Sequence, residues 1–359
     1  MSELEFKIRD SFTKELENEW LDLSKLSEVS IFQNFSWQHC WFENINKKEA
    51  KNSLFIISIY FKKKIIGILP FEKKKYLNLN ILGLTGAPFA DYCDFIIDSK
   101  FLKSNDNIKK LIREFVFNIE GIDLVIFDKV KESSNLHILF DNLTLNQRNY
   151  NSYQLKKENG NNNLIPKKFL SDTNRQIKKL NLRGTISYKI ASTTLEKERV
   201  LEFFLTNKAK QLEITKSWNY LKKEIYKNFL IKMFELNDAH LSFLSLNDKI
   251  IAVHLGYLKE NKLIYLFPTY DREYANFSPG NILIIKMINN FFKNNGLEFD
   301  FTTGDENYKI RLSNRKQRIF YKIISLNFKS NFVKVLIELF NYIKQIKYLR
   351  LVIQKINHL

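Results

Sequence analysis

The pattern of apolar and polar residues predicts strands and helices in alternation along the first part of the chain. Apolar or alternating runs predict strands at 54–60, 65–70 and 122–127. Apolar residues at helical spacing predict helices at 10–46 and 107–119. These patterns indicate an α/β fold in which helices cover the sheets.

The same pattern predicts a more regular order in the second half. Helices are expected at 195–211 and 220–236, followed by a meander of three strands at 240–246, 250–257 and from 262 onward. Strands joined by such short turns pair with their sequence neighbours. The second half is therefore expected to contain an antiparallel sheet whose last strand leads into the stretch 263–309.

The functional prediction depends most on the stretch 263–309. An apolar strand at 263–267 leads through a polar loop to Ser-Pro-Gly and a helix, and a second strand follows at 297–301. Ser278 is a suitable N-cap residue, and Pro279 suits the first helical position because the missing N–H has no partner there. Gly296 then ends the helix.

The start of this helix has the composition of an anion site. Ser278 to Asn281 contain no Asp or Glu, although the positive end of the helix dipole favours acids there. Gly280 has no Cβ and lets a ligand approach the backbone N–H groups closely. The alternative is an ordinary helix cap that binds nothing, and these residues alone do not separate the two.

A polar, Asn-rich segment at 141–166 predicts a domain boundary. The expected division is a first domain at 1–150, a second at 151–330 and a C-terminal amphipathic helix within 331–359. That helix, at 332–356, carries apolar residues at helical spacing with Lys and Arg between them, so it suits packing on the protein or lying on an anionic membrane surface.

The charge of the chain favours anionic partners. The formal net charge is +18, which suits a phosphorylated cofactor, a nucleic acid or an acidic membrane face, yet no DNA-binding motif accompanies it. Two cysteines, Cys40 and Cys93, suit a reducing compartment and exclude a cysteine-rich metal site. No signal-peptide core or uncharged spanning run occurs, which predicts a cytoplasmic protein.

Several short motifs follow one another in a defined order. They are Arg175 in a basic helix, Tyr270-Asp271, Ser278-Pro279-Gly280 with Leu283, Phe299-Asp300-Phe301 with Gly304, and Tyr308-Lys309. In this order they resemble the CelD/BcsL-type acetyltransferases, GNAT-superfamily relatives with the tandem fold of Fem-type peptidyl transferases. The resemblance is strongest between Arg175 and Lys309. The usual GNAT phosphate loop, Q/R-x-x-G-x-G/A, is replaced by Ser-Pro-Gly.

The resemblance implies an α/β fold of two tandem GNAT-like domains, with mixed, mostly antiparallel sheets flanked by helices. It also implies an acyltransferase activity. The expected reaction moves an acetyl or other acyl group from acyl-CoA to an amine of a sugar or related small molecule, without a metal, in polysaccharide or cell-envelope biosynthesis. Ser278, Pro279, Gly280 and Asn281 would hold the donor phosphates, with Arg175 as a second contact.

The resemblance also implies roles for four further residues. Asp271, in the loop before the helix, is the first candidate for the base, and His254, in the strand at 250–257, is the second. Lys309 resembles a lysine that Fem-type enzymes place near the reacting carbonyl, where it would stabilise charge with Tyr308 beside it.

Two other functions fit the same sequence. An aminoacyl-tRNA donor, as in Fem-type transferases, suits the basic charge and Lys309, although the long charged two-helix arm of some of those enzymes is missing from the pattern. A non-catalytic component of polysaccharide assembly would instead use the C-terminal helix for peripheral membrane contact.

Overall fold

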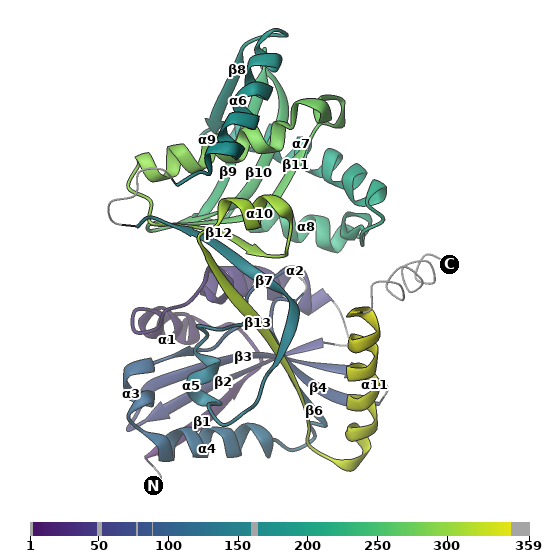
Figure 1. Cartoon of the computed structure of the whole chain (residues 1–359). Helices are drawn as coiled ribbons and strands as arrows, with labels where there is room; N and C mark the ends of the chain where they lie inside the picture. The colour runs from purple at the N-terminus through teal and green to yellow at the C-terminus, as the bar shows by residue number, and fades with distance from the viewer. Residues whose placement is uncertain (1–2, 49–51, 77, 88, 159–163, 346–359) are drawn as a thin grey trace. The chain divides into compact units, whose positions relative to one another are not determined.

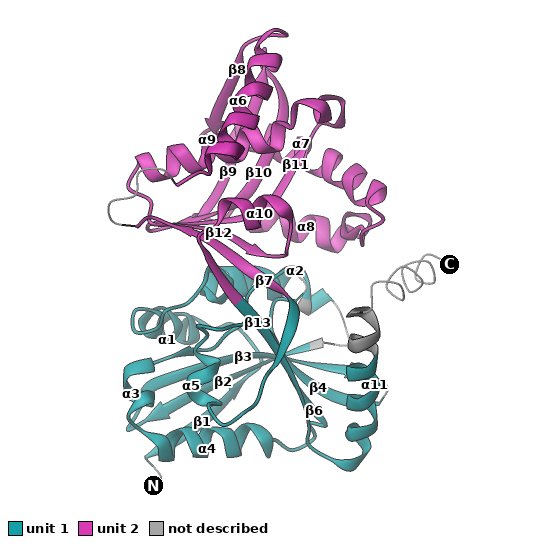
Figure 2. Cartoon of the chain, in the orientation of Figure 1, with its two compact units in different colours: residues 1–149, 318–359 teal, residues 150–317 magenta. Residues whose placement is uncertain are grey.

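The computed structural model describes residues 3–48, 52–76, 78–87, 89–158 and 164–345 (Figure 1). The chain forms two compact units (Figure 2). Unit 1 comprises residues 1–149 and 318–359, and unit 2 comprises residues 150–317. The change of unit after residue 149 lies beside the boundary expected at 150, whereas residues 318–330 belong to unit 1 and not to the second half.

Unit 1 contains a mixed sheet. Its strands run in the order β1 (Leu4–Arg9), β2 (Asn52–Phe61), β3 (Lys64–Tyr76), β4 (Leu79–Leu84), β6 (Leu124–Lys131) and β13 (Arg315–Ser325), with β5 (Ile96–Ile97) paired to β3. The helices are α1 (Lys14–Ser24), α2 (Phe35–Asn44), α3 (Ser99–Lys103), α4 (Asp106–Phe117), α5 (Leu136–Leu139) and α11 (Phe328–Gln345), with 3-10 turns η1 (Ile31–Gln33) and η2 (Asn46–Lys48). Only β4 and β6 pair in parallel among these neighbours.

Unit 2 contains a further set of paired strands. Its strands run in the order β7 (Asn146–Lys156), β12 (Glu298–Thr303), β11 (Lys262–Tyr270), β10 (Lys249–Lys259), β9 (Ala239–Leu246) and β8 (Ile186–Ile190). The helices are α6 (Lys167–Asn181), α7 (Thr194–Ile214), α8 (Glu224–Met233), α9 (Pro279–Lys293) and α10 (Asn307–Leu312), with 3-10 turns η3 (Tyr220–Lys222) and η4 (Arg272–Phe277). Only β11 and β12 pair in parallel here.

The last strand of each half of the sequence completes the sheet of the other unit. β7 follows the unit 1 elements along the chain, yet it pairs with β12. β13 follows the unit 2 elements, yet it pairs with β6. A domain made of residues 1–150 alone would therefore lack a strand of its sheet.

Helix α11 begins at Phe328, four residues before the predicted start. The predicted residues 346–356 lie outside the described part of the chain. Among the described residues, no helix combines the length and the apolar character needed to cross a bilayer.

Helix α9 is the centre of the unit 2 core. Pro279 occupies the first turn of this helix. The apolar side chains of α9 are buried on nearly every side, and the helix packs against β9, β10 and β11. Leu283 is 1% exposed and belongs to the same cluster as Phe299 and Phe301 on β12. The interior around α9 is closely packed and cannot rearrange freely. Helix α9 therefore fixes the positions of the strands that pack against it.

We therefore predict that Leu283→Ala lowers the free energy of unfolding by about 3 kcal/mol, because it removes buried methyl groups and leaves a cavity. The matched control is Leu297→Ala, whose side chain is 53% exposed, and it should change stability by less than about 0.5 kcal/mol. Urea denaturation of both variants measures the difference. Equal losses would contradict the central role of α9.

Candidate active site

Strands β11 and β12 separate from one another after a short paired segment. Their parallel register joins Lys262 to Glu298 and ends at Ile264 and Asp300. Beyond that point β11 contains Pro268, which has no N–H to donate to a neighbouring strand. On β12, Thr302 has a φ of 60°, a left-handed conformation that interrupts regular pairing. The two strands therefore lose their pairing toward their carboxyl ends, and we call this unpaired stretch the opening between them.

Two lysines bond the carbonyl oxygens at this opening. The Nζ of Lys208, on α7, donates to the carbonyl oxygen of Pro268 at 3.2 Å and to the Oε1 of Gln211 at 3.3 Å. The Nζ of Lys309, on α10, donates to the carbonyl oxygen of Thr303 at 2.5 Å. An ammonium has three N–H donors, so both lysines retain capacity for a further acceptor. We call these two residues the lysine pair.

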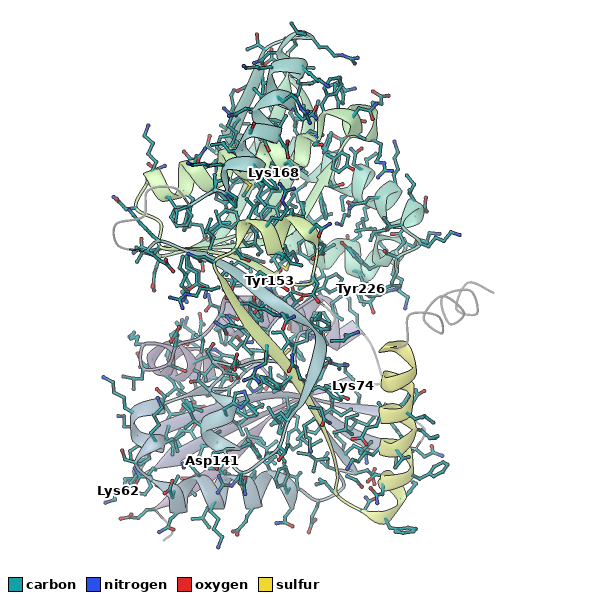
Figure 3. The ribbon with its side chains drawn as sticks, viewed as in Figure 1. Lys62, Lys74, Asp141, Tyr153, Lys168 and Tyr226 are labelled. Atoms are coloured by element: carbon teal, nitrogen blue, oxygen red, sulfur yellow. The ribbon has the colours of Figure 1, made fainter. Side chains whose placement is uncertain are left out.

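Glu306 balances the charge of the lysine pair. Its Oε2 lies 3.1 Å from the Nζ of Lys309, and its carboxylate is 55% exposed. Gly304 makes this position accessible, because a Cβ at Gly304 would lie 2.4 Å from the same oxygen, and its φ of 117° suits glycine. Tyr153, labelled in Figure 3, steadies the same loop by donating its hydroxyl to the Oδ1 of Asp305 at 2.8 Å.

The pKa of Lys208 reflects this environment. Burial lowers the pKa from 10.5 to about 8, the charge of Lys309 acts in the same direction, and the charge of Glu306 opposes both. The pKa of Lys208 thus depends on the charges of both Lys309 and Glu306. A lysine with a pKa near neutrality exchanges its proton at physiological pH, which is a property of acid–base groups in enzymes.

Aromatic rings form the interior beside these groups. The ring of Tyr265, on β11, lies 6.2 Å from that of Tyr308 in an edge-to-face arrangement. Burial raises the pKa of Tyr265, and the charge of Glu306 adds to the effect. The predicted neighbours Tyr308 and Lys309 are thus brought to the same side of the opening as Glu306.

His254 lies in the core beneath Tyr265. Its ring stacks on that of Tyr265 at 4.3 Å, and its side chain is fully buried. Its Nε2 accepts a hydrogen bond from the N–H of Leu266 at 3.3 Å, where β10 and β11 shift register. Burial holds the pKa of His254 well below its usual range, so the imidazole is neutral.

The start of α9 differs from the predicted cap. Ser278 stands at the N-cap position, but its φ of 49° and ψ of 53° are left-handed and its hydroxyl makes no capping bond. An N-cap side chain normally reaches the helix amides from an extended backbone, which is absent at Ser278 because η4 ends there. The prediction of a side-chain cap was wrong, whereas Pro279 does occupy the first turn.

The backbone amides of this turn are partly used. The N–H groups of Asn281 and Ile282 both donate to the carbonyl oxygen of Ser278, at 2.9 and 3.2 Å. Gly280 lies beside Tyr270, since a Cβ there would meet that ring at 3.6 Å. The first turn holds no acid, so the helix dipole is not neutralised by a side chain of that turn.

Arg175 lies away from this turn, along an exposed part of α6. It is 68% exposed and makes a long ion pair with Asp172, at 3.9 Å. Arg183, just beyond the end of α6, places its guanidinium 4.6 Å from the ring of Phe277, next to Ser278. Arg183 is therefore the arginine beside the start of α9.

Asp271 caps η4. Its carboxylate accepts the N–H of Glu273 at 3.0 Å and lies 3.3 Å from the Nζ of Lys249. In the described part of the chain, none of the residues that contact Asp271 also contacts Lys309. The carboxylate that the structure brings to Lys309 is Glu306.

Comparison with known proteins identifies the region that carries these features. Residues 167–310 match the family model described as an acetyltransferase (GNAT) domain. This part of the chain is therefore similar to GNAT acetyltransferase domains. The match supports an acyltransferase and includes the lysine pair, Glu306 and the start of α9. A search of curated protein sequences gave no significant match.

Solved structures share the fold along almost the whole chain. FemX is 12% identical with a TM-score of 0.56, covering 88% of this chain and 96% of FemX. L-PGS from Bacillus licheniformis is 12% identical with a TM-score of 0.55, covering 92% and 98%. A conserved protein of unknown function from Bacteroides thetaiotaomicron is 11% identical with a TM-score of 0.54, covering 89% and 100%. At these identities the likeness shows the fold alone, and it confirms the predicted GNAT-like α/β fold.

Sequence reasoning missed three residues of this candidate site. Lys208 and Tyr265 gave no signal, since each lies inside a regular helix or strand pattern. Glu306 directly precedes Asn307, Tyr308 and Lys309, so its position beside a candidate lysine was the available signal. Among the described residues, no group of three His, Cys, Asp or Glu is placed to hold a metal ion.

The lowered pKa of Lys208 predicts a pH dependence of stability. The folded pKa is about 8 and the ordinary value is 10.5, so between these values the unfolded chain binds more protons and the free energy of unfolding rises with pH. Lys208→Met should remove about 1–3 kcal/mol of this rise. Exposed Lys210→Met is the control and should keep it. Urea denaturation at several pH values measures the slopes; identical slopes in wild type and Lys208→Met would refute the lowered pKa.

Proposed function

We propose that the GNAT-like domain transfers an acyl group, in the first instance acetyl from acetyl-CoA, to an amine of a sugar or related small molecule. The observation that carries the proposal is the lysine pair at the opening between β11 and β12. Acyl transfer needs donors for the oxyanion that forms on the carbonyl, and two ammonium groups with unused N–H capacity meet that need. Such an acceptor suits polysaccharide or cell-envelope biosynthesis.

The donor would lie along the opening between these strands. The backbone of β11 beyond Ile264 is no longer paired to β12, so an extended, amide-bearing chain such as the arm of CoA can bond to it as an added strand would. The pyrophosphate would lie at the start of α9, where the acid-free turn and Arg183 favour an anion. Because two amides of the turn already bond to Ser278, the dipole and Arg183 contribute more than free N–H groups.

The chemistry then divides between three side chains. Glu306 takes a proton from the acceptor ammonium, and the neutral amine attacks the acyl carbonyl carbon. A C–N bond forms, and the negative charge that develops on the carbonyl oxygen is stabilised by Lys309 and Lys208. The attacking nitrogen loses its second proton, the C–S bond breaks, and the leaving thiolate takes up that proton. Asp271 is a second carboxylate for the base role, and its capping bond and Lys249 partner weigh against it.

We predict that Lys309→Met and Glu306→Gln each lower kcat/KM by about 10²–10³-fold, because each removes charge that acts in the transition state. Lys208→Met should lower it by at least about tenfold. Asp271→Asn and the control Lys210→Met should stay within about threefold of wild type. Release of CoA from acetyl-CoA with a panel of amino sugars measures the rates. Full activity of both Lys309→Met and Glu306→Gln would disprove this site.

The donor class is tested separately. Acetyl-CoA at about a hundred times its dissociation constant should raise the apparent stability by about 2.7 kcal/mol in a thermal-shift assay. Arg183→Ala should weaken this binding by about five- to tenfold, and Arg175→Ala should weaken it less. Tight, salt-dependent binding of tRNA with no effect of acetyl-CoA would instead favour an aminoacyl-tRNA donor.

A further inference from the structure

Helix α11 is held to unit 1 by one of its faces. Val333 and Ile337 pack on an apolar cluster of the sheet formed by Leu79, Ile81, Leu124, Tyr321 and Ile323. Ser330 is fully buried, and its hydroxyl bonds to the hydroxyl of Ser325 at 2.7 Å and the carbonyl of Asn327 at 2.9 Å. These contacts fix the rotation of the helix, so its other face is turned outward by the packing itself.

The outward face of α11 is apolar. Five side chains form it: Phe328 at 95% exposure, Phe332 at 69%, Val335 at 56%, Leu336 at 45% and Leu339 at 52%. Their spacing along the helix places them in one continuous stripe, which we call the α11 stripe. Single exposed apolar residues are common on proteins, but a contiguous row of large ones marks an interaction surface.

Positive charge accompanies the α11 stripe. Within α11 there are three cations, Lys329, Lys334 and Lys344, and one acid, Glu338. Apolar residues interleaved with Lys and Arg form the pattern of a helix that lies in the plane of a membrane interface. The stripe therefore differs from an ordinary core face left uncovered.

Strand β3 adds one lysine beside this helix. Lys329, on α11 itself, donates its Nζ to the carbonyl oxygen of Asn78, in the β3–β4 turn, at 3.1 Å. Lys74, on β3, is the register partner of Ile81 and so shares the sheet face that α11 covers, and its Nζ lies 2.6 Å from the Oε1 of Glu72. The nearby carboxylate of Asp123 accepts hydrogen bonds from Asn80 and Asn327, so it is engaged within the protein.

We propose that the α11 stripe docks unit 1 on the surface of an anionic lipid bilayer. The apolar side chains would enter the interface, and the lysines around them would contact anionic headgroups. A second copy of the chain fits less well, because two such helices face to face would bring like charges together in a protein of net charge +18. This inference does not depend on the proposed acyl transfer.

The test uses the full chain and co-sedimentation with vesicles. Wild type should bind vesicles of phosphatidylcholine mixed with phosphatidylglycerol, bind less as salt rises, and bind vesicles of phosphatidylcholine alone only weakly. Phe332→Glu with Leu336→Glu should weaken binding by at least about tenfold, because both side chains are exposed and their replacement removes the inserted surface. Lys329→Glu with Lys334→Glu should weaken binding to the anionic vesicles alone.

Leu195→Glu is the matched control, since Leu195 is 66% exposed on α7, and it should bind vesicles as wild type does. Unchanged circular dichroism and an unchanged midpoint of urea denaturation would show that the α11 variants remain folded. The proposal is overturned if wild type ignores both kinds of vesicle, or if the Phe332 and Leu336 variant binds as well as wild type. It is also overturned if light scattering shows a dimer that this variant dissociates.

Discussion

The short pairing between β11 and β12 is the constraint from which the site follows. Parallel strands that remained paired to their ends would satisfy each other's carbonyl oxygens and leave no opening. Here pairing stops at Ile264 and Asp300, and the carbonyl oxygens of Pro268 and Thr303 need other donors. Lys208 and Lys309 supply them. Two cations are thus drawn to the opening by the backbone itself.

Holding two ammonium groups near one another costs free energy, and a bound anion would offset part of that cost. Their mutual repulsion appears in the effect of Lys309 on the pKa of Lys208, and Glu306 offsets part of it. An anionic oxygen placed between them would relieve the repulsion further. In the proposed acyl transfer, this arrangement would be more complementary to a developing oxyanion than to a neutral carbonyl, which is the requirement for catalysis over simple binding.

Much of the fold was predictable because its signals are local. The strands expected at 240–246 and 250–257 agree with β9 and β10, whose apolar residues alternate or run continuously over a short turn. The helix expected at 10–46 is two helices, α1 and α2. Strand β1 was missed although Leu4, Phe6 and Ile8 alternate with charged residues, which is the pattern of a half-buried edge strand. The exchange of β7 and β13 is a long-range pairing, and no local pattern encodes it.

The site could be predicted only for residues that lie close in sequence to a predicted strand. Lys309 and Tyr308 come directly after a predicted strand, so their place at its carboxyl end could be inferred. Lys208 is one of 57 Lys and Arg residues, and nothing in a helical pattern distinguishes the lysine that reaches a strand from those that face water. Asp271 follows a strand as Lys309 does, yet Lys249 and the η4 cap occupy it.

His254 shows how a candidate base becomes part of the framework. The register shift between β10 and β11 frees the N–H of Leu266, and the Nε2 of His254 accepts it. Gly256 leaves room for the ring, because a Cβ there would lie 2.6 Å from the imidazole. Only a neutral imidazole can accept this bond, and burial keeps it neutral. Protonation would break the bond at the bulge and place a charge next to His240, so the neutral ring of His254 stabilises the bulge between β10 and β11.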